Sequence, residues 1–319
     1  MDIKKKLLYM LENSDTVISG ETLAGKLNVS RNYVWKVINS LRNDGYIIDA
    51  VTNKGYSLSE KNILFSVFGI EKHLKFKCDI QIYDNLSSTN TLAKQLADGG
   101  CEDKTIVIAR EQSDGKGRLG RRFHSARGGL YMSVVLRPIL SIADTPLITV
   151  AAAVAVSRAV DKICDVSTGI KWVNDIFLNG KKICGILTQG SVNVENGSVD
   201  HVVLGIGLNI NKPTEDFPEE LKNIATSIYY TPVNSRVQNK LIAEILNEFF
   251  TIYENMEKSN FLDEYRSRSI IIGKEVICVT DGGEFPATVK SIDNSAHLIV
   301  VDKYGKTHKL SSGEVRVKI

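Results

Sequence analysis

Apolar residues recur at helical spacing in the first part of the chain, which predicts three short helices, with Ser19 and Ser30 as caps of the second and third. The third helix carries an apolar stripe with the spacing i, i+3, i+4 and i+7, made by Val34, Val37, Ile38 and Leu41. Residues 45–59 then form two short runs around the turn "TNKG", which predicts a β-hairpin. The first 60 residues therefore read as a small unit of their own.

The side of the third predicted helix that faces away from its apolar stripe is polar. A step of 100° per residue places Asn32, Lys36 and Asn39 there, with Arg31 beside them in the first turn. Such side chains donate to phosphates and base edges when a helix enters the major groove of DNA. The candidate DNA-binding residues are Ser30, Arg31, Asn32, Tyr33, Lys36 and Asn39. The alternative is a three-helix bundle whose polar face is only solvated.

Charge does not decide between these two interpretations. Residues 1–60 hold six Lys and two Arg against four Asp and three Glu, which leaves a net charge of +1. Because phosphate neutralisation supplies most non-specific affinity, one copy is expected to bind DNA weakly. A DNA reader of this kind needs two copies.

The pattern changes to longer α/β elements between about Phe65 and about Arg268. Two helices are predicted, one starting at Ser87 or Ser88 and one with Thr145 as its cap. Strands are predicted in "KTIVIA", "GLYMSVVL" and "HVVLGIGLNIN". The glycines of the last segment do not form a dinucleotide fingerprint, because isoleucine occupies the third glycine position of GxGxxG.

The clearest local signal is "DIFLNGKKICGIL", where an Asn-Gly pair suits a two-residue turn between two strands. Strict alternation puts Lys182 on one face of the second strand with Cys184 and Ile186, and Lys181 on the other face. A lysine among apolar neighbours either lies at an edge, with its amine reaching solvent, or is held in a pocket for chemistry. The pattern leaves both possibilities open.

Composition is that of an ordinary globular protein, with 43% hydrophobic and 24% charged residues in 319. A net charge of +3 is too small for a general polyanion binder, so any nucleic-acid contact must be local. The five cysteines are never closer than 20 residues, which excludes CxxC zinc or redox spacing. Since no segment resembles a signal peptide or a membrane span, we expect a cytoplasmic protein without membrane contact.

One short stretch, "QSDGKGRLGRRF", concentrates positive charge on a flexible backbone. Lys116, Arg118, Arg121 and Arg122 lie there, with glycines between them. A phosphate-binding loop, a nucleic-acid patch and a solvated linker are the three interpretations that the residues allow.

Four segments in chain order resemble the signatures of biotin–protein ligases. They are "SSTN" at Ser87–Asn90, "GKGRLGR" at Gly115–Arg121, "KWVNDIFLNGKKICGIL" at Lys171–Leu187 and "GIGLNIN" at Gly205–Asn211. The sequence departs from the usual motifs at three positions, with Lys116 for arginine, Val173 for proline and Phe123 for tryptophan. None of these changes removes a reacting group.

The resemblance implies an α+β chain of three domains. Residues 1–62 resemble the winged helix-turn-helix of the bifunctional members, which also repress the biotin operon. Residues 63–269 resemble the mixed α/β catalytic domain, and residues 270–319, short strands between tight turns, resemble the family's small SH3-like β-barrel.

The resemblance also implies the chemistry. With ATP and Mg²⁺, biotin becomes biotinyl-5′-AMP, and the acyl group then passes to one lysine of a biotin carboxyl carrier acceptor protein. The expected catalytic residues are Lys182 and Arg118, cations for the carboxylate and the phosphates, and Asp175, which assists the attacking lysine. Asp175 is also a weak candidate ligand for Mg²⁺.

Two overlapping sets of residues are expected to bind the two substrates. The biotin set is Ser88, Thr89, Asn90, Gln112, Lys116, Gly117, Arg118, Lys182 and Gly185. The nucleotide set is Gly115, Arg118, Arg121, Lys171, Asn174, Lys182 and Asn209.

Beyond the acceptor protein, the resemblance implies operator DNA and a ligand-linked homodimer as partners, with biotinyl-5′-AMP as corepressor. Two other functions stay open. One is a lipoate-type protein ligase on a related fold, which would have no use for donors and acceptors aimed at a ureido ring. The other is a biotin-sensing repressor with weak catalysis.

Overall fold

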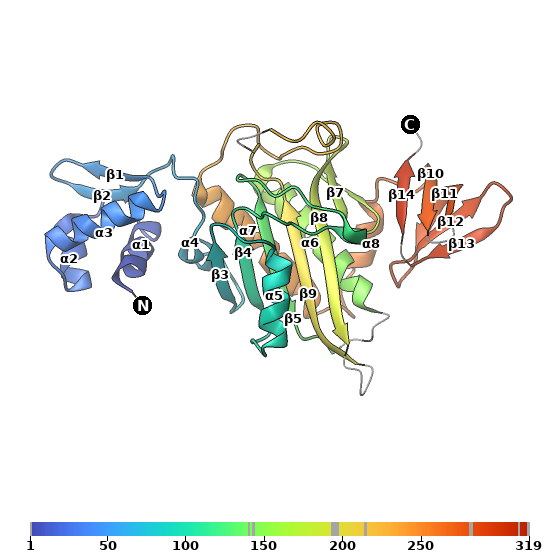
Figure 1. The fold of residues 1–319 in the computed structure, drawn as a ribbon, viewed down its shortest axis with the longest axis horizontal. Coiled ribbons are helices and arrows are strands. Elements are labelled where there is room, and N and C mark those ends of the chain that lie inside the picture. Colours follow the sequence, from blue (N-terminus) through green and yellow to red (C-terminus); the bar gives the residue numbers. More distant parts are fainter. Residues whose placement is uncertain are drawn as a thin grey trace. The chain divides into compact units, whose positions relative to one another are not determined.

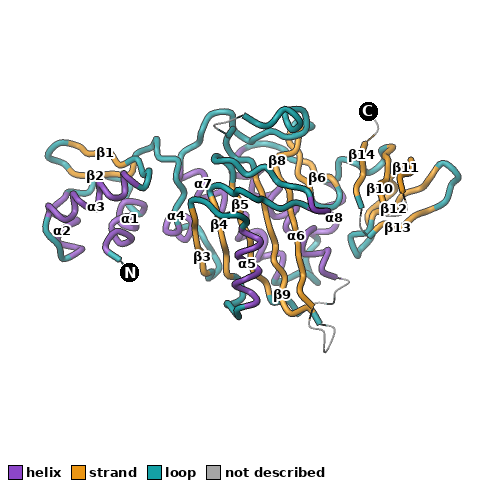
Figure 2. The backbone as a smooth tube through the Cα atoms, in the orientation of Figure 1, coloured by secondary structure: helices purple, strands orange, loops and turns teal. Residues whose placement is uncertain are grey.

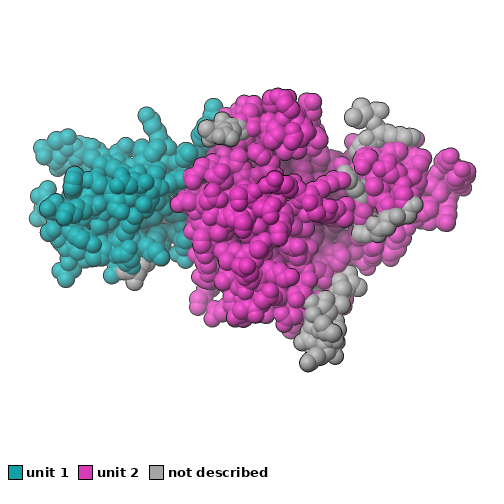
Figure 3. All heavy atoms as spheres, in the orientation of Figure 1, with its two compact units in different colours: residues 1–75, 231–244 teal, residues 76–230, 245–319 magenta. Residues whose placement is uncertain are grey.

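The structure is a computed structural model that describes residues 2–139, 141, 144–192, 198–213, 216–280, 283–311 and 313–317. The chain divides into two compact units, coloured separately in Figure 3. Unit 1 comprises Met1–Lys75 and Thr231–Glu244, and unit 2 comprises Phe76–Tyr230 and Ile245–Ile319. No described helix is both long and apolar enough to cross a membrane.

Unit 1 begins with three helices and a hairpin, as the sequence predicts. The elements are α1 (Ile3–Glu12), α2 (Gly20–Leu27), α3 (Arg31–Asn43), β1 (Ile48–Val51), β2 (Gly55–Leu58) and α4 (Val67–Glu71). Both expected caps are confirmed. The Ser19 hydroxyl accepts from Thr22 N at 3.0 Å, and the Ser30 hydroxyl accepts from Tyr33 N at 3.1 Å. These bonds satisfy amides that have no partner within their helices.

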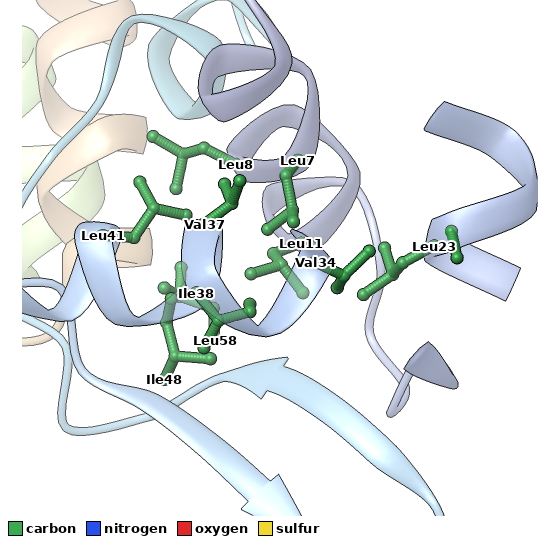
Figure 4. Packing of buried hydrophobic residues seen from close by; sticks show 11 residues of the cluster. Leu7, Leu8, Leu11, Leu23, Val34, Val37, Ile38, Leu41, Ile48 and Leu58 are labelled. Carbon is green, nitrogen blue, oxygen red and sulfur yellow. The ribbon is translucent and has the colours of Figure 1, made fainter. Parts of the chain in front are cut away.

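The core of this unit lies between α1 and α3. Figure 4 shows the apolar stripe of α3, Val34, Val37, Ile38 and Leu41, beside leucines of α1. Leu7 and Leu11 of α1 are buried, and Leu23 of α2 belongs to the same buried cluster. Burial of one face fixes which side of α3 points outward.

Unit 2 is built on a seven-stranded mixed sheet, seen in Figures 1 and 2, with the order β3-β4-β5-β9-β8-β7-β6. Only the β3–β4 pair is parallel among its described pairs. The strands are β3 (Asp79–Tyr83), β4 (Thr105–Ala109), β5 (Leu130–Leu136), β6 (Gly169–Lys171), β7 (Asp175–Leu178), β8 (Lys181–Val192) and β9 (Val199–Leu208). The strands predicted in "KTIVIA", "GLYMSVVL" and "HVVLGIGLNIN" are thereby confirmed.

Helices α5 (Thr89–Asp98) and α6 (Thr145–Cys164) pack against this sheet, and α8 (Phe261–Ser267) packs against α6. The first half of helix α7 (Ser235–Tyr253) belongs to unit 1 and its second half to unit 2. Helix α5, in front of the sheet in Figure 1, packs Ala93 and Ala97 against valines of β4, β5 and β9. Ser88 occupies its N-cap position as expected. The predicted cap of α6 is wrong: the helix already includes Thr145, and Asp144 takes the cap position.

The last part of unit 2 is a five-stranded antiparallel sheet with the order β13-β12-β11-β10-β14. Its strands are β10 (Glu275–Thr280), β11 (Gly283–Ile292), β12 (Leu298–Asp302), β13 (Thr307–Leu310) and β14 (Glu314–Val317). The short strands and tight turns predicted for this region are therefore present. The indole of Trp172 donates to the carbonyl of Ala296 at 2.8 Å, which fastens this sheet beside β6 and β7.

Candidate active site

A pocket in unit 2 gathers nearly all of the residues that the sequence nominates for ligand binding. It is lined by residues of the α5 start, of the glycine-rich basic loop (residues 115–122), of the β6–β7 segment, of β8 and β9, and of the C-terminal sheet. The nominated residues in its wall are Ser88, Thr89, Asn90, Gln112, Lys116, Gly117, Arg118, Arg121, Lys171, Asn174, Asp175, Lys182 and Gly185. Segments that are far apart in the chain thus meet around one cavity.

Two nominated residues lie outside this wall. Gly115 closes the base of the basic loop, where an added Cβ would lie 2.4 Å from Ser125 Oγ and 2.5 Å from the carbonyl oxygen of Phe123. Asn209 lines a separate small cavity with His124, and its amide donates to the carbonyl of Thr226 at 3.1 Å. Neither residue therefore lines the pocket, and contact of either with the nucleotide stays a prediction.

One end of the pocket is a polar cluster at the start of α5. Gln112 Oε1 accepts from Thr89 N at 2.7 Å and from the Thr89 hydroxyl at 3.0 Å, while Gln112 Nε2 donates to Ser125 Oγ at 2.9 Å. The Ser88 hydroxyl makes no capping bond in α5. The orientation of the Gln112 amide is therefore set by its neighbours, as a site for a polar ligand requires.

The cluster continues below α5 through two residues that the sequence analysis missed. Ser133 Oγ lies 2.8 Å from Thr89 Oγ1 and 2.7 Å from Asn90 Oδ1, and Asn90 Nδ2 donates to Gln189 Oε1 at 3.0 Å. Ser133 is fully buried. A lone serine in the apolar run "GLYMSVVL" was a usable signal, whereas nothing in the sequence marks Gln189.

Three glycines of β8 and β9 form the floor of the pocket. A Cβ at Gly205 would lie 2.1 Å from Asn90 Oδ1, and one at Gly207 would lie 2.6 Å from the Phe123 ring. A Cβ at Gly185 would lie 3.0 Å from the Phe123 ring. The glycines therefore let side chains from other segments approach the sheet backbone closely.

The cation–carboxylate pair of the pocket is Lys182 with Asp175. Lys182 Nζ lies 2.6 Å from Asp175 Oδ1, and the two side chains are 25% and 24% exposed. Lys182 Nζ also lies 6.0 Å from the centre of the Phe123 ring. The amine thus lies in the wall of the pocket, whereas a chemical role for it stays a prediction.

The predicted face of Lys182 is wrong, and a β-bulge explains the error. Ile176 pairs with Cys184, and Phe177 pairs with Lys182, so Ile183 is an extra residue in β8. The extra residue breaks the alternation, and Lys182 comes to the same face as Gly185, where an added Cβ would lie 3.1 Å from Lys182 Nζ. Lys181 lies apart, with its amine donating to the carbonyl of Lys222 at 2.8 Å.

Arg118 reaches into the pocket from the basic loop. Its Nη1 donates to Asn174 Oδ1 at 2.9 Å, and its Nη2 donates to the carbonyl of Gly313 at 3.2 Å. The Asn174 amide in turn donates to the carbonyl of Ile186 at 2.9 Å. The guanidinium is therefore oriented by oxygens of two segments, the turn between β6 and β7 and the residue before β14.

The basic loop is a compact turn in this structure. Gly117 N donates to the carbonyl of Arg121 at 2.7 Å, and Phe123 N donates to that of Gly115 at 2.8 Å. Leu119, at the tip, has φ 55° and is 72% exposed. Since the cations Lys116, Arg118, Arg121 and Arg122 line the pocket, the loop is not a detached solvated linker.

The polar face predicted for α3 is exposed only in part. Val34 and Ile38 are fully buried, and Asn32 and Lys36 are exposed. Asn39 is half-buried, and its Oδ1 accepts from Arg42 Nη1 at 3.4 Å. Trp35, which the sequence analysis did not nominate, is 52% exposed. DNA contact by these side chains stays a prediction, but the geometry leaves them accessible.

Comparisons with known proteins agree with this architecture. Residues 83–209 match the biotin/lipoate A/B protein ligase family, and residues 4–57 match an HTH domain. The bifunctional ligase/repressor BirA of Bacillus subtilis is 35% identical over 323 residues, which cover 99% of this chain and 98% of that protein. The biotin–[acetyl-CoA-carboxylase] ligase of Mycobacterium tuberculosis is 30% identical and covers 74% of this chain and 88% of that one.

Among solved structures, the biotin protein ligase from Aquifex aeolicus in complex with biotin and ATP has a TM-score of 0.61 and 25% sequence identity. The match covers 76% of this chain and 99% of the Aquifex chain. The central sheet of unit 2 therefore has the biotin protein ligase fold. Since a bifunctional relative at 35% identity spans nearly the whole chain, the protein belongs to the family of bifunctional biotin ligases and repressors.

Proposed function

We infer that the protein ligates biotin to a lysine of an acceptor protein, at the expense of ATP, and represses transcription through its N-terminal helices. The observation that carries this inference is the convergence of Lys182, Asp175 and Arg118 with a fixed polar cluster in one pocket. The chain that contains this pocket is similar over nearly its full length to bifunctional ligase/repressors.

In the first half-reaction, an oxygen of the biotin carboxylate attacks the α-phosphorus of ATP, and pyrophosphate leaves. Both partners are anions, so positive charge and positioning lower the barrier. Lys182 supplies the charge next to the attacking carboxylate and the α-phosphate, and Arg118 supplies it from the loop. Arg121, Lys171 and Asn174 line the same pocket and serve the nucleotide.

Biotin binds with its ureido ring at the polar cluster. Ser88, Thr89, Asn90 and Gln112 offer hydroxyl, amide and carbonyl groups there, which match a ring with one carbonyl and two N–H groups. The backbone at Lys116 and Gly117 lies along the path of the valeryl chain, and Gly185 leaves room for it. Gly115 and Asn209 support this arrangement from outside the wall.

The donors of the pocket fit a magnesium ion that arrives with ATP. Among the described residues there is no cluster of three or more His, Cys, Asp or Glu side chains, and Asp175 is the carboxylate of the wall. Mg²⁺ binds through one or two carboxylates plus substrate phosphates, and it neutralises phosphate charge. Asp175 is therefore the proposed protein ligand.

In the second half-reaction, the acceptor lysine attacks the acyl carbon of biotinyl-5′-AMP, and AMP leaves. The amine must first lose a proton. Asp175 is the proposed acceptor of that proton, since it lies beside Lys182 in the same wall. Acceptance by Asp175 requires its ion pair with Lys182 to loosen once the adenylate has formed.

We propose that the chain has three domains, residues 1–62, 63–269 and 270–319, and that the last is an SH3-like barrel. The first of these domains carries out repression. The residues that meet DNA are Ser30, Arg31, Asn32, Tyr33, Lys36 and Asn39 of the α3 face. Biotinyl-5′-AMP acts as corepressor by favouring a homodimer that presents two α3 helices to the biotin operator. The protein works in the cytoplasm, where its acceptor, a biotin carboxyl carrier protein, is made.

One assay tests the ligase assignment directly. The purified protein is incubated with biotin, ATP, Mg²⁺ and a biotin acceptor domain, and the product is probed with streptavidin. We expect labelling that needs ATP and is absent when the acceptor lysine is replaced by arginine. Transfer of lipoate in place of biotin would contradict the proposal and favour the lipoate-type alternative.

A further inference from the structure

The C-terminal sheet takes part in the pocket although its residues lie far along the chain. Gly313 and Val315 belong to the pocket wall, and Gly313 directly precedes β14. Through its carbonyl, Gly313 accepts from Arg118 Nη2 at 3.2 Å, while Asn174 accepts from Nη1 at 2.9 Å. The turn between β6 and β7 and the residue before β14 thus both hold one guanidinium.

The carbonyl of Gly313 has a fixed location because its sheet is anchored beside the pocket. Trp172, which is 4% exposed, donates to the carbonyl of Ala296 at 2.8 Å. Arg266 of α8 donates to the carbonyl of Ile292 at 2.7 Å. These two bonds hold the C-terminal sheet against Trp172 of the pocket wall and against α8. The sheet therefore gives Gly313 a fixed position relative to the basic loop.

The backbone at position 313 requires glycine. Its φ of 121° is a conformation that residues with a side chain rarely adopt. A Cβ there would also lie 2.7 Å from the carbonyl oxygen of Val279, a rigid strand atom of β10. Any side chain would therefore displace the carbonyl that receives Arg118.

We propose that Gly313 is a positioning residue for Arg118 in the ligase site. The oxygens of Asn174 and Gly313 are neutral, so these two hydrogen bonds orient the guanidinium without themselves opposing its charge. The planar fork of arginine can meet two acceptors in fixed directions at once, which lysine cannot do. This inference rests on the role proposed above for Arg118.

The test is a double-mutant cycle of Gly313→Ala and Arg118→Lys, read as biotin-dependent pyrophosphate release from ATP. Gly313→Ala should lower kcat about tenfold in the native background and by less than about twofold in the Arg118→Lys background, because the two residues act together. The matched control is Gly305→Ala, another glycine of this sheet with φ 82° and nothing within 4 Å of an added Cβ. It should leave kcat within about twofold of the native value.

A reciprocal measurement avoids any change at position 313. In Arg118→Lys, hydrogen exchange of residues 313–317 should be at least about threefold faster than in the native protein, because a bond to this segment is lost. Arg127→Lys, whose partner is Glu111 on the surface, should leave that exchange unchanged.

The outcomes separate two kinds of failure. A folded Gly313→Ala variant with native kcat, an equal loss in both backgrounds, or unchanged exchange in Arg118→Lys overturns the role of Gly313. If the native protein itself releases no pyrophosphate with biotin and ATP, the proposed ligase function fails, whatever Gly313 does.

Discussion

Lys182 Nζ lies 2.6 Å from Asp175 Oδ1, across the two strands of one hairpin, whereas the adjacent Lys181 donates to a backbone carbonyl away from the pocket. The bulge at Ile183 makes this difference, because it turns Lys182 to the face that carries Gly185. In the proposed reaction, a substrate carboxylate or phosphate takes the place of Asp175 beside this amine.

Replacement of Lys182 by methionine should nearly abolish adenylate formation. Loss of a charge stabiliser of this kind typically costs ~10²–10³ in rate. The measurement is biotin-dependent pyrophosphate release. Lys181→Met is the matched control and should remain close to native, since Lys181 does not line the pocket. Equal losses in the two variants would contradict the assignment of Lys182.

Arg118→Gly should weaken retention of the adenylate. The guanidinium joins the glycine-rich loop to Asn174 and Gly313. Its removal should therefore let the loop open and release the adenylate. Activated biotin would then escape and label lysines of bystander proteins. The measurement is streptavidin blotting of added serum albumin, with Arg127→Gly as the control from the same segment. The idea is abandoned if bystander labelling by Arg118→Gly equals that by the native protein.

Gly205→Ala should raise the KM for biotin by about tenfold or more, because one misplaced group in a pre-organised site costs this much. The added Cβ would lie 2.1 Å from Asn90 Oδ1, and Asn90 is held by Ser133 and Gln189 and cannot move aside freely. Gly190→Ala in β8 is the control, with nothing within 4 Å of its Cβ. A native KM in folded Gly205→Ala would show that Asn90 does not bind biotin.

Glu264 of α8 should stabilise the fold in a pH-dependent way. Burial raises the pKa of Glu264, but hydrogen bonds from Arg158 and Arg268 outweigh it and hold this pKa below its usual value of 4.5. A lowered folded-state pKa means that the stabilisation is complete above the unfolded pKa and is lost as pH falls through the folded one.

We therefore expect Glu264→Gln to lower the free energy of unfolding by about 2 kcal/mol at pH 7, a usual value for hydrogen bonds to charged groups. The difference from the native protein should shrink below about pH 4. Urea unfolding at the two pH values measures it, with the exposed Glu257→Gln as control. A pH-independent difference would mean that the ion pairs of Glu264 contribute nothing.

Features set by local sequence were predictable. The caps at Ser19 and Ser30, the stripe of α3 and the Asn-Gly hairpin all depend on residues a few positions apart. Most of the pocket residues nominated from the sequence were predictable from four motifs, because each motif brings its own segment to the same cavity.

Features set by distant segments were not predictable. The face of Lys182 depends on a bulge whose cause lies in the pairing of two strands, and strict alternation gave the opposite answer. Gln189 and Gly313 enter the site only through contacts with Asn90 and Arg118, across long stretches of chain. The cap of α6 was misplaced by one residue, at Thr145 instead of Asp144, which is common at helix ends.

The central claim is that one intermediate, made in this pocket, serves both ligation and repression. The most direct test measures binding to biotin-operon operator DNA, with and without biotin plus ATP, for the native protein and for Lys182→Met. We expect the two substrates to tighten native binding about tenfold or more, a coupling of ~1.4 kcal/mol, and to leave Lys182→Met unchanged because it makes no adenylate. Equal native affinity in both conditions, or the same tightening in Lys182→Met, would contradict the account.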